Sequence, residues 1–146
     1  MVELTQIQTR QLAAQQALGC LKEALEIMNS DPMAQKYYKQ MRNSAIQCFE
    51  FSIDTLWKLL KEYLLYVHKI QLSPPSPKAA FQEALRVNLI NHSQLDVFFN
   101  IVDARNITSH TYNEKLAEQI SKELPEYYIL MQSVLDKIKL NNDIVI

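Results

Sequence analysis

One short stretch of the sequence combines three side chains that can act on phosphate esters: Arg105, His110 and Tyr112. RNA is cleaved without a metal ion when a base removes the proton of the ribose 2′-hydroxyl and an acid protonates the leaving oxygen. A histidine with a pKa near neutrality suits either role, and an arginine stabilises the negative charge of the phosphorane. A tyrosine hydroxyl can donate a hydrogen bond or accept a transferred group. These residue types predict phosphoryl chemistry, with Arg105 on the phosphate and His110 as acid or base.

Helical geometry sorts the polar side chains of this stretch into two lines. If residues 94–112 form one helix, a turn of about 100° per residue places Asp103, Asn106 and His110 on one line. Asp103 or Asn106 can then orient the imidazole, and Asp103 would raise its pKa. The second line contains Arg105 and continues an apolar stripe. The guanidinium of Arg105 therefore needs a carboxylate, a phosphate or carbonyl groups as a partner. The members of this line are Leu95, Phe98, Val102, Arg105, Ser109 and Tyr112.

Arg105 and His110 do not converge on an ideal helix, because the step between them turns the helix by about 140°. Two arrangements bring them together. Either the helix loosens after Ile107-Thr108, whose β-branched side chains weaken it, or two copies of the chain meet at a dimer axis. Spacing alone favours a third, purely structural interpretation, in which the histidine caps carbonyl groups at the helix end and the arginine forms an ion pair.

Other candidate sites have less support. Glu50 and Asp54 share a helix face and can act as a carboxylate pair, although a solvated helix face is the favoured interpretation. The sequence has one glycine, which excludes the glycine-rich loops that bind dinucleotides and nucleoside triphosphates. It contains no HExxH pattern and no paired cysteine–histidine spacing. We therefore expect neither a cofactor nor a metal ion.

The composition is that of a single globular domain covering residues 1–146. Hydrophobic residues make up 48% of the chain, and the formal net charge is −1. This charge excludes a large basic field, so any RNA contact must be local or supplied by an oligomer. The sequence lacks the pattern of a signal peptide and of a membrane span, so we expect a cytoplasmic protein without a membrane contact. Cys20 and Cys48 fall in helical patterns and are expected to be small buried hydrophobes.

Apolar residues recur at steps of three and four along most of the chain, which predicts helices. Asp31-Pro32 and Ser76-Pro77 each combine a helix N-cap with a proline at the first helical position, and Ser93 with Asp96 resembles a capping box. Pro125 is expected to kink the last helix or to split it. The pattern predicts an all-α, up-and-down bundle of four to five helices. The expected helices cover residues 4–28, 32–71, 77–89, 94–112 and 114–140.

Two sets of residues resemble a known family. The first is Arg105-Asn106-Ile107-Thr108-Ser109-His110, which is similar to the HEPN motif of an arginine, a polar residue, a few further positions and a histidine. Its extension, His110-Thr111-Tyr112, looks like the variant found in HEPN proteins that are paired with minimal nucleotidyltransferases. The second set is similar to the long-helix signature of the nucleotidyltransferase substrate-binding proteins, and the whole resemblance covers about residues 41–128. This set consists of Gln47-Cys48-Phe49-Glu50-Phe51, Leu56-Trp57-Lys58, Lys61-Glu62-Tyr63-Leu64 and, within Ser73 to Leu89, Pro74, Pro77, Phe81, Glu83 and Ala84.

The resemblance implies a helical homodimer in which the motif copies line a cleft at the dimer interface. It also implies a partner, a small nucleotidyltransferase encoded nearby. In related toxin–antitoxin pairs the HEPN member is an RNase toxin, and the partner silences it by transferring nucleotidyl groups to the motif tyrosine. The expected site therefore has Arg105 and His110 for catalysis and Tyr112 for modification. Four further polar residues are expected to support them: Asp103, Asn106, Ser109 and Glu50.

Three functions remain open from the sequence. The first is a metal-independent endoribonuclease toxin. The second is a non-catalytic subunit that presents a nucleotide or another substrate to the transferase. The near-neutral charge favours this second function, and so does Cys48, which stands where the family pattern would have a basic residue. The third is a purely structural helical module.

Overall fold

The computed structural model describes residues 4–30, 35–110 and 113–145, with the backbone alone described for His110 and for 139–145. Within these ranges the secondary structure is helical and includes no strand, so the predicted all-α class is confirmed. The predicted cap at Asp31-Pro32 lies outside the described residues. The helices are α1 (Leu4–Ser30), α3 (Tyr38–His68), α4 (Pro77–Arg86), α5 (His92–His110) and α6 (Glu114–Val145).

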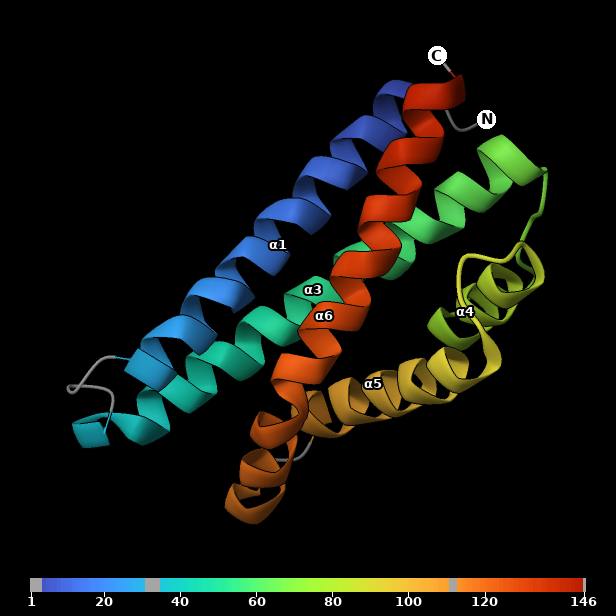
Figure 1. The fold of residues 1–146 in the computed structure, drawn as a ribbon. Helices are drawn as coiled ribbons and strands as arrows, with labels where there is room; N and C mark the ends of the chain where they lie inside the picture. The colour runs from blue at the N-terminus through green and yellow to red at the C-terminus, as the bar shows by residue number, and fades with distance from the viewer. Residues whose placement is uncertain (1–3, 31–34, 111–112, 146) are drawn as a thin grey trace.

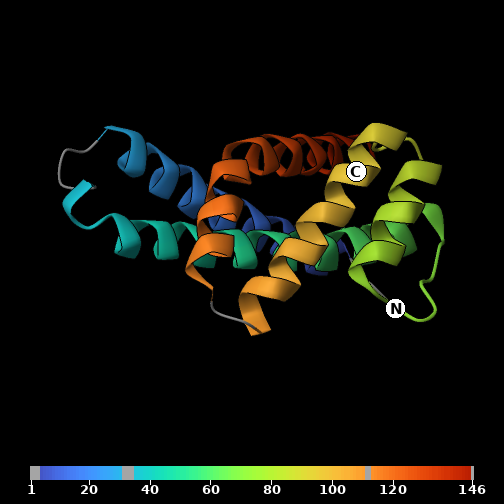
Figure 2. The ribbon, with the colours of Figure 1, turned by 90° about the horizontal axis from the view of Figure 1, so that it is seen from below.

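Three long helices form the body of the molecule. α1 and α3 lie side by side and run in opposite directions, and α6 packs against both of them (Figure 1). α4 and α5 pack on the remaining part of α3, and α5 crosses α3 obliquely in the view of Figure 2. α6 then returns to the end of the molecule at which α1 begins. α1 and α5 therefore run one way and α3 and α6 the other, which is the alternation that an up-and-down bundle requires, and α5 brings its motif against α3.

The buried apolar residues of these helices form one core. The predicted stripe of α3 is buried from Ile46 to Tyr63. Phe49 of α3 stacks on Tyr127 of α6 with the ring centroids 5.8 Å apart. Phe81 of α4 stacks on Phe98 of α5 with the centroids 4.1 Å apart. Burial of each such ring contributes about 2–3 kcal/mol, so these contacts fix α6 against α3 and α5 against α4. The buried residues of α1 are Ile7, Ala14, Leu18 and Leu21.

The start of α5 differs from the predicted one. The helix begins at His92, before the expected Gln94, and the pair Ser93 and Asp96 is not its capping box. Instead, Asn91 Oδ1 accepts a hydrogen bond from the Gln94 N–H at 2.8 Å, and Gln94 Oε1 accepts one from the Asn91 N–H at 2.9 Å. This reciprocal pair satisfies two backbone donors that the first turn leaves open.

Other helix ends also differ from the expected ones, and α3 itself begins at Tyr38 rather than at residue 32. α3 ends at His68 rather than near Gln71, because Lys69 adopts a left-handed conformation with a φ of 58°. α4 starts with the predicted Ser76 cap, whose Oγ accepts a hydrogen bond from the Ala79 N–H at 3.1 Å, but it ends at Arg86, before the expected Leu89.

Pro125 lies inside α6, which remains one continuous helix. Figure 2 shows this helix bending in its first part, where its colour passes from orange to red. Proline removes a backbone hydrogen bond and crowds the preceding turn, which accounts for a bend in this region of the sequence. Of the two predicted outcomes, a kink is therefore observed rather than a split.

The prediction for the two cysteines is half right. Cys48 of α3 is buried, with 7% of its surface exposed, but Cys20 of α1 is exposed. Helical periodicity predicted burial for both residues, but it did not show that Cys20 lies on the exposed side of α1.

Candidate functional site

Arg105 lies on α5, and its guanidinium contacts α3. Its Nε and Nη2 donate hydrogen bonds to the two carboxylate oxygens of Asp54, at 2.9 and 2.8 Å. Its Nη1 donates to Ser109 Oγ, one helical turn further along α5, at 2.7 Å. The sequence left open whether the guanidinium of Arg105 pairs with a carboxylate, a phosphate or carbonyl groups, and the structure shows a carboxylate. The hydrogen bonds to Asp54 raise the pKa of Arg105 above its ordinary value, which keeps the guanidinium charged.

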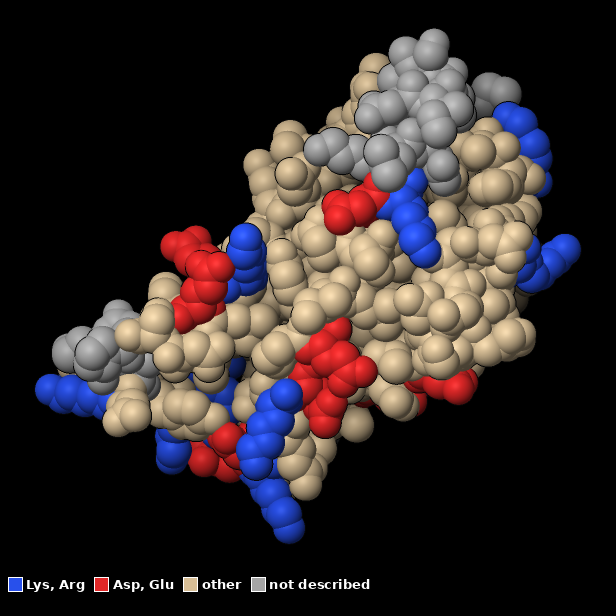
Figure 3. Space-filling view, in the orientation of Figure 1, with Lys and Arg blue, Asp and Glu red and all other residues tan. Residues whose placement is uncertain are grey.

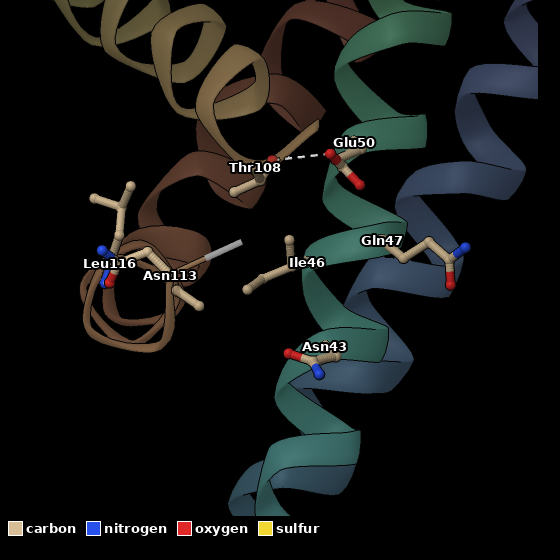
Figure 4. Close-up of a pocket in the computed structure, with 8 residues that line it drawn as sticks. Asn43, Ile46, Gln47, Glu50, Thr108, Asn113 and Leu116 are labelled. Carbon is tan, nitrogen blue, oxygen red and sulfur yellow. Dashed lines mark hydrogen bonds between the residues drawn. The ribbon is translucent and has the colours of Figure 1, made fainter. Parts of the chain in front are cut away.

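Glu50 lies one turn before Asp54 on α3 and holds the next part of α5. Its Oε2 accepts a hydrogen bond from the Thr108 hydroxyl at 2.8 Å (Figure 4). The same oxygen accepts one from the Ser109 hydroxyl at 2.6 Å. Ser109 therefore links the guanidinium of Arg105 to the carboxylate of Glu50. The structure thus brings together three of the residues that the sequence singled out: Arg105, Ser109 and Glu50.

These contacts show that the favoured interpretation of Glu50 and Asp54, a solvated helix face, is wrong. Both carboxylates are half-buried between α3 and α5, and each bonds to side chains of the motif helix. Sequence reasoning missed Asp54 as the partner of Arg105, although its spacing from Glu50 was a usable signal. With two carboxylates against one guanidinium, this junction carries an excess of negative charge. A phosphate would need a further cation to bind here.

Asp103 points towards α4, whereas Asn106 lies beside Arg105 and Asp54. Asp103 Oδ1 pairs with Lys78 Nζ of α4 at 2.8 Å, and its side chain is exposed. Asn106 is exposed and lines a recess of about 190 Å³ together with Trp57 and Arg105. Asp103 is therefore engaged with a lysine of a neighbouring helix.

His110 is the last residue of α5, and its side chain lies outside the described atoms, as do Thr111 and Tyr112. The helix does not loosen after Ile107-Thr108, because α5 continues through His110. An unbroken helix keeps Arg105 and His110 on different faces. Of the two predicted routes to convergence, the loosened helix is therefore wrong, and the dimer axis stays a prediction.

A recess of about 290 Å³ opens between α3 and the start of α6, beside the end of α5. Its apolar lining comes from Ile46, Leu116 and Ala117. Figure 4 shows Ile46 pointing from α3 into the space towards α6, with the hydrogen-bonded Glu50 and Thr108 at one end. The size and mixed lining suit a small planar ligand with polar edges. The other polar side chains of the lining are Asn43, Gln47 and Asn113.

A second arginine lies on α3 next to this recess. Arg42 has a side chain that is 3% exposed, and it pairs with Glu114 at 3.5 Å and with Glu118 at 3.3 Å, both on α6. The Tyr38 hydroxyl donates to Glu118 at 2.5 Å. The hydrogen bond from Tyr38, and then that from Arg42, lowers the pKa of Glu118, while burial and then Glu118 raise the pKa of Tyr38. These contacts fix the first turns of α6, which follow Tyr112 in the sequence.

Elsewhere among the described residues, charged side chains and potential metal ligands do not gather in one place. On the face drawn in Figure 3, basic and acidic side chains alternate with uncharged ones. Among the residues that the structure describes, no group of three or more His, Cys, Asp or Glu side chains gathers in a way that could hold a metal ion. No described helix is long and apolar enough to cross a membrane.

Comparison with known proteins assigns this fold to a family. Residues 10–140 match the family described as nucleotidyltransferase substrate binding protein like. The chain belongs to this family. A Haemophilus influenzae protein described as a probable ribonuclease HepT is 30% identical over 100 residues, which cover 67% of each chain. A crystal structure of a Thermus thermophilus protein matches with a TM-score of 0.73 and 34% identity, over 86% of this chain and 98% of that one.

Membership in the nucleotidyltransferase substrate-binding family confirms the resemblance that the motifs indicated. The match is longer than the motifs, since it includes most of α1 and α6. The name of the family associates its members with a nucleotidyltransferase. Cys48, where the family pattern would have a basic residue, is buried against α1, so this position gives no positive charge to the site.

Proposed function

We propose that this nucleotidyltransferase substrate-binding protein is a metal-independent endoribonuclease toxin, in which Arg105 and His110 are catalytic and Tyr112 is modified by a partner nucleotidyltransferase. The observation that carries the proposal is the anchoring of Arg105. Its two hydrogen bonds to Asp54 hold the guanidinium of a side chain that is 29% exposed, on the helix that ends at His110. The likeness to a protein described as a probable ribonuclease supports the same activity.

In the proposed reaction, the ribose 2′-oxygen loses its proton to a base and attacks the neighbouring phosphorus. The bond from phosphorus to the 5′-oxygen breaks, the leaving oxygen is protonated, and a 2′,3′-cyclic phosphate remains. His110 acts as the base or the acid of these two transfers. Asp54 and Ser109 accept three N–H groups of Arg105, and its remaining N–H groups can donate to the phosphorane oxygens.

The proposed active form is a homodimer. An unbroken α5 separates Arg105 from His110, and the carboxylates of α3 leave the junction with excess negative charge. A second copy would bring another arginine and histidine into the same cleft and so supply the geometry that one helix lacks. Exposed apolar side chains next to the site offer surface for this contact, since Phe51 is 58% and Ile107 39% exposed.

The proposed control by the partner acts through charge. A nucleotidyl group on the Tyr112 hydroxyl adds a negatively charged phosphate two residues from His110. That phosphate would repel the RNA backbone from a site that already holds two carboxylates. Modification of this one hydroxyl is therefore sufficient to silence the nuclease without unfolding it.

The test is RNA cleavage by the purified dimer in the presence of a metal chelator and without the partner. We expect cleavage products with cyclic phosphate ends, and growth arrest when the chain is expressed alone. His110→Ala should abolish both effects. His92→Ala is the matched control, because His92 lies at the opposite end of the same helix and is exposed. If RNA stays intact and His110→Ala changes nothing, the proposal fails.

A second candidate function is a non-catalytic subunit that binds a nucleotide for the transferase. The recess beside Glu50 favours it, since its apolar walls and amide side chains suit a nucleobase. This function predicts nucleotide binding that depends on Arg105, which is linked to Glu50 of the recess through Ser109, with no cleavage of RNA. Calorimetry that detects no nucleotide binding, with or without the transferase, would exclude it.

A further inference from the structure

Outside the proposed site, one pair of side chains has a reactivity that the proposed function does not use. Cys20 of α1 and Cys48 of α3 are 28 positions apart in the sequence, and their Sγ atoms lie 3.0 Å apart. Cys20 is exposed and Cys48 is buried. Both thiols are free, so the two helices place an exposed cysteine directly beside a buried one.

We propose that Cys20 and Cys48 are a redox-modification site, at which a peroxide converts the two thiols into a reversible disulfide that fastens α1 to α3. The two sulfur atoms need only a small approach to reach the bond length of about 2.05 Å, so the packed helices do not have to separate. Among the described residues, no third His, Cys, Asp or Glu joins the pair to complete a metal site. A disulfide is therefore the modification that this geometry suits.

The chemistry balances with one peroxide. The Cys20 thiolate attacks one peroxide oxygen, the O–O bond breaks, and the other oxygen leaves as water after taking a proton. Cys20 is then a sulfenic acid. The sulfur of Cys48 next attacks the sulfur of Cys20, the S–S bond forms, and the S–O bond breaks. The departing hydroxide takes the proton of Cys48 and leaves as a second water.

The order of these steps follows from burial. Cys20 is exposed and therefore meets the oxidant first. Burial, and then the neighbouring Cys20, raises the pKa of Cys48 to about 12, so its thiol is protonated at neutral pH and reacts second. Cys48 thus acts as the resolving residue, which protects Cys20 from further oxidation.

The disulfide would act on stability through the unfolded chain. It joins residues on either side of the α1–α3 connection, and such a cross-link removes conformational freedom from the unfolded state. For a loop of this length we expect the melting temperature to rise by about 5–10 °C. Cys48 lies two residues before Glu50, so the bond would also restrain the part of α3 that carries the two carboxylates of the site.

The test oxidises the purified full-length protein with hydrogen peroxide. We expect the intact mass to fall by two hydrogen atoms per chain. Titration of the denatured protein should detect neither thiol, and a non-reducing gel should show no covalent dimer. The melting temperature should rise, and dithiothreitol should reverse the rise. Cys20→Ser and Cys48→Ser should each remove the shift.

A matched control moves the accessible thiol without changing the number of thiols. Cys20→Ser combined with Lys22→Cys turns the thiol by about 200° around α1, at a position that is also exposed. This variant should form no internal disulfide. Equal disulfide yield in the control would overturn the proposal. So would oxidation of Cys20 to a sulfinic acid or to a covalent dimer while Cys48 keeps a free thiol. These thiol measurements do not depend on the proposed nuclease activity.

Discussion

Two arginines, Arg105 and Arg42, join α3 to its neighbours in opposite ways. Arg105 reaches from α5 to Asp54 on α3, and both side chains are partly exposed, at 29% and 31%. Arg42 reaches from α3 to Glu114 and Glu118 on α6, and here the arginine side chain is 3% exposed while the two glutamate side chains are 48% and 36% exposed. At one junction the arginine is open to a ligand, and at the other it is enclosed by the fold.

This difference separates a chemical role from a structural one. A buried guanidinium has lost its hydration, so its contacts must be kept for the fold to be stable. A partly exposed guanidinium that is held at two points is oriented at little cost and keeps N–H groups for a phosphate. The same residue type therefore serves packing on one side of α3 and, in our proposal, catalysis on the other.

Replacing Arg105 with alanine should produce the largest change in activity. We expect the rate of RNA cleavage to fall at least about 100-fold, because a positioned cation on the phosphorane is lost. The free energy of unfolding should fall by only about 1 kcal/mol, since the ion pair with Asp54 is partly exposed. Initial cleavage rates and urea denaturation measure the two effects. Arg105→Lys should restore little activity, because lysine cannot make the two-point contact.

Replacing Arg42 with alanine should show the opposite balance. We expect the free energy of unfolding to fall by about 2 kcal/mol, through lost packing and unpaired carboxylates that can partly rehydrate. Cleavage per folded molecule should stay unchanged. Arg86→Ala is the control, because Arg86 is 73% exposed in its pair with Glu83 and its loss should cost under about 0.5 kcal/mol. A large loss of cleavage in folded Arg42→Ala would remove the contrast between the two arginines.

The sequence predicted the helices well because their apolar spacing is local information. The stripe of α3 needs only the step of three and four residues, and it is buried as expected. Helix ends were less predictable, since they depend on single backbone conformations such as the left-handed Lys69, or on which of several polar residues caps the turn. Such choices differ by about 1 kcal/mol or less, and the spacing of apolar residues does not encode them.

The candidate site was predictable in part. The position of Arg105 on an apolar stripe required a partner, but Asp54 lies 51 residues away and is brought to it only by the packing of α5 on α3. The same holds for Cys20 and Cys48, which are 28 residues apart. The roles of His110 and Tyr112 come from the motif and stay predictions. Contacts between distant residues are therefore what the structure adds to the sequence.

Asp54→Asn should test whether the open arginine is positioned by its carboxylate. We expect kcat for RNA cleavage to fall about 10-fold, because a displaced guanidinium stabilises the phosphorane less well. KM should fall as well, because removal of one negative charge weakens the repulsion of RNA. A purely structural role would not lower KM. Asp103→Asn is the control, because Asp103 is exposed and pairs with Lys78 on another helix. Unchanged kcat and KM in Asp54→Asn would contradict a positioning role.

The smallest expected effect concerns the enclosed arginine and acid. The pKa of Glu118 is lowered by Tyr38 and then by Arg42, so its ionised form favours the folded state. Stability from this group is present above the ordinary pKa of glutamate and is lost as the pH falls through the lowered value. Glu118→Gln should therefore reduce stability at neutral pH by about 0.5 kcal/mol, since the carboxylate is 36% exposed, and by less in acid.

Urea denaturation at neutral pH and at a pH below the ordinary pKa of glutamate measures this difference. Glu123→Gln is the matched control on the same helix, because Glu123 is exposed, and its effect on stability should vary less with pH. Tyr38→Phe should move the pKa of Glu118 back towards its ordinary value, because the hydrogen bond that lowers it most is lost. If the wild type and Glu118→Gln lose stability in parallel on acidification, charge does not hold the α3–α6 junction. The two arginines would then differ only in their burial. The proposed role of Arg105 would follow from its exposure and not from any difference in how strongly each arginine pairs with its carboxylates.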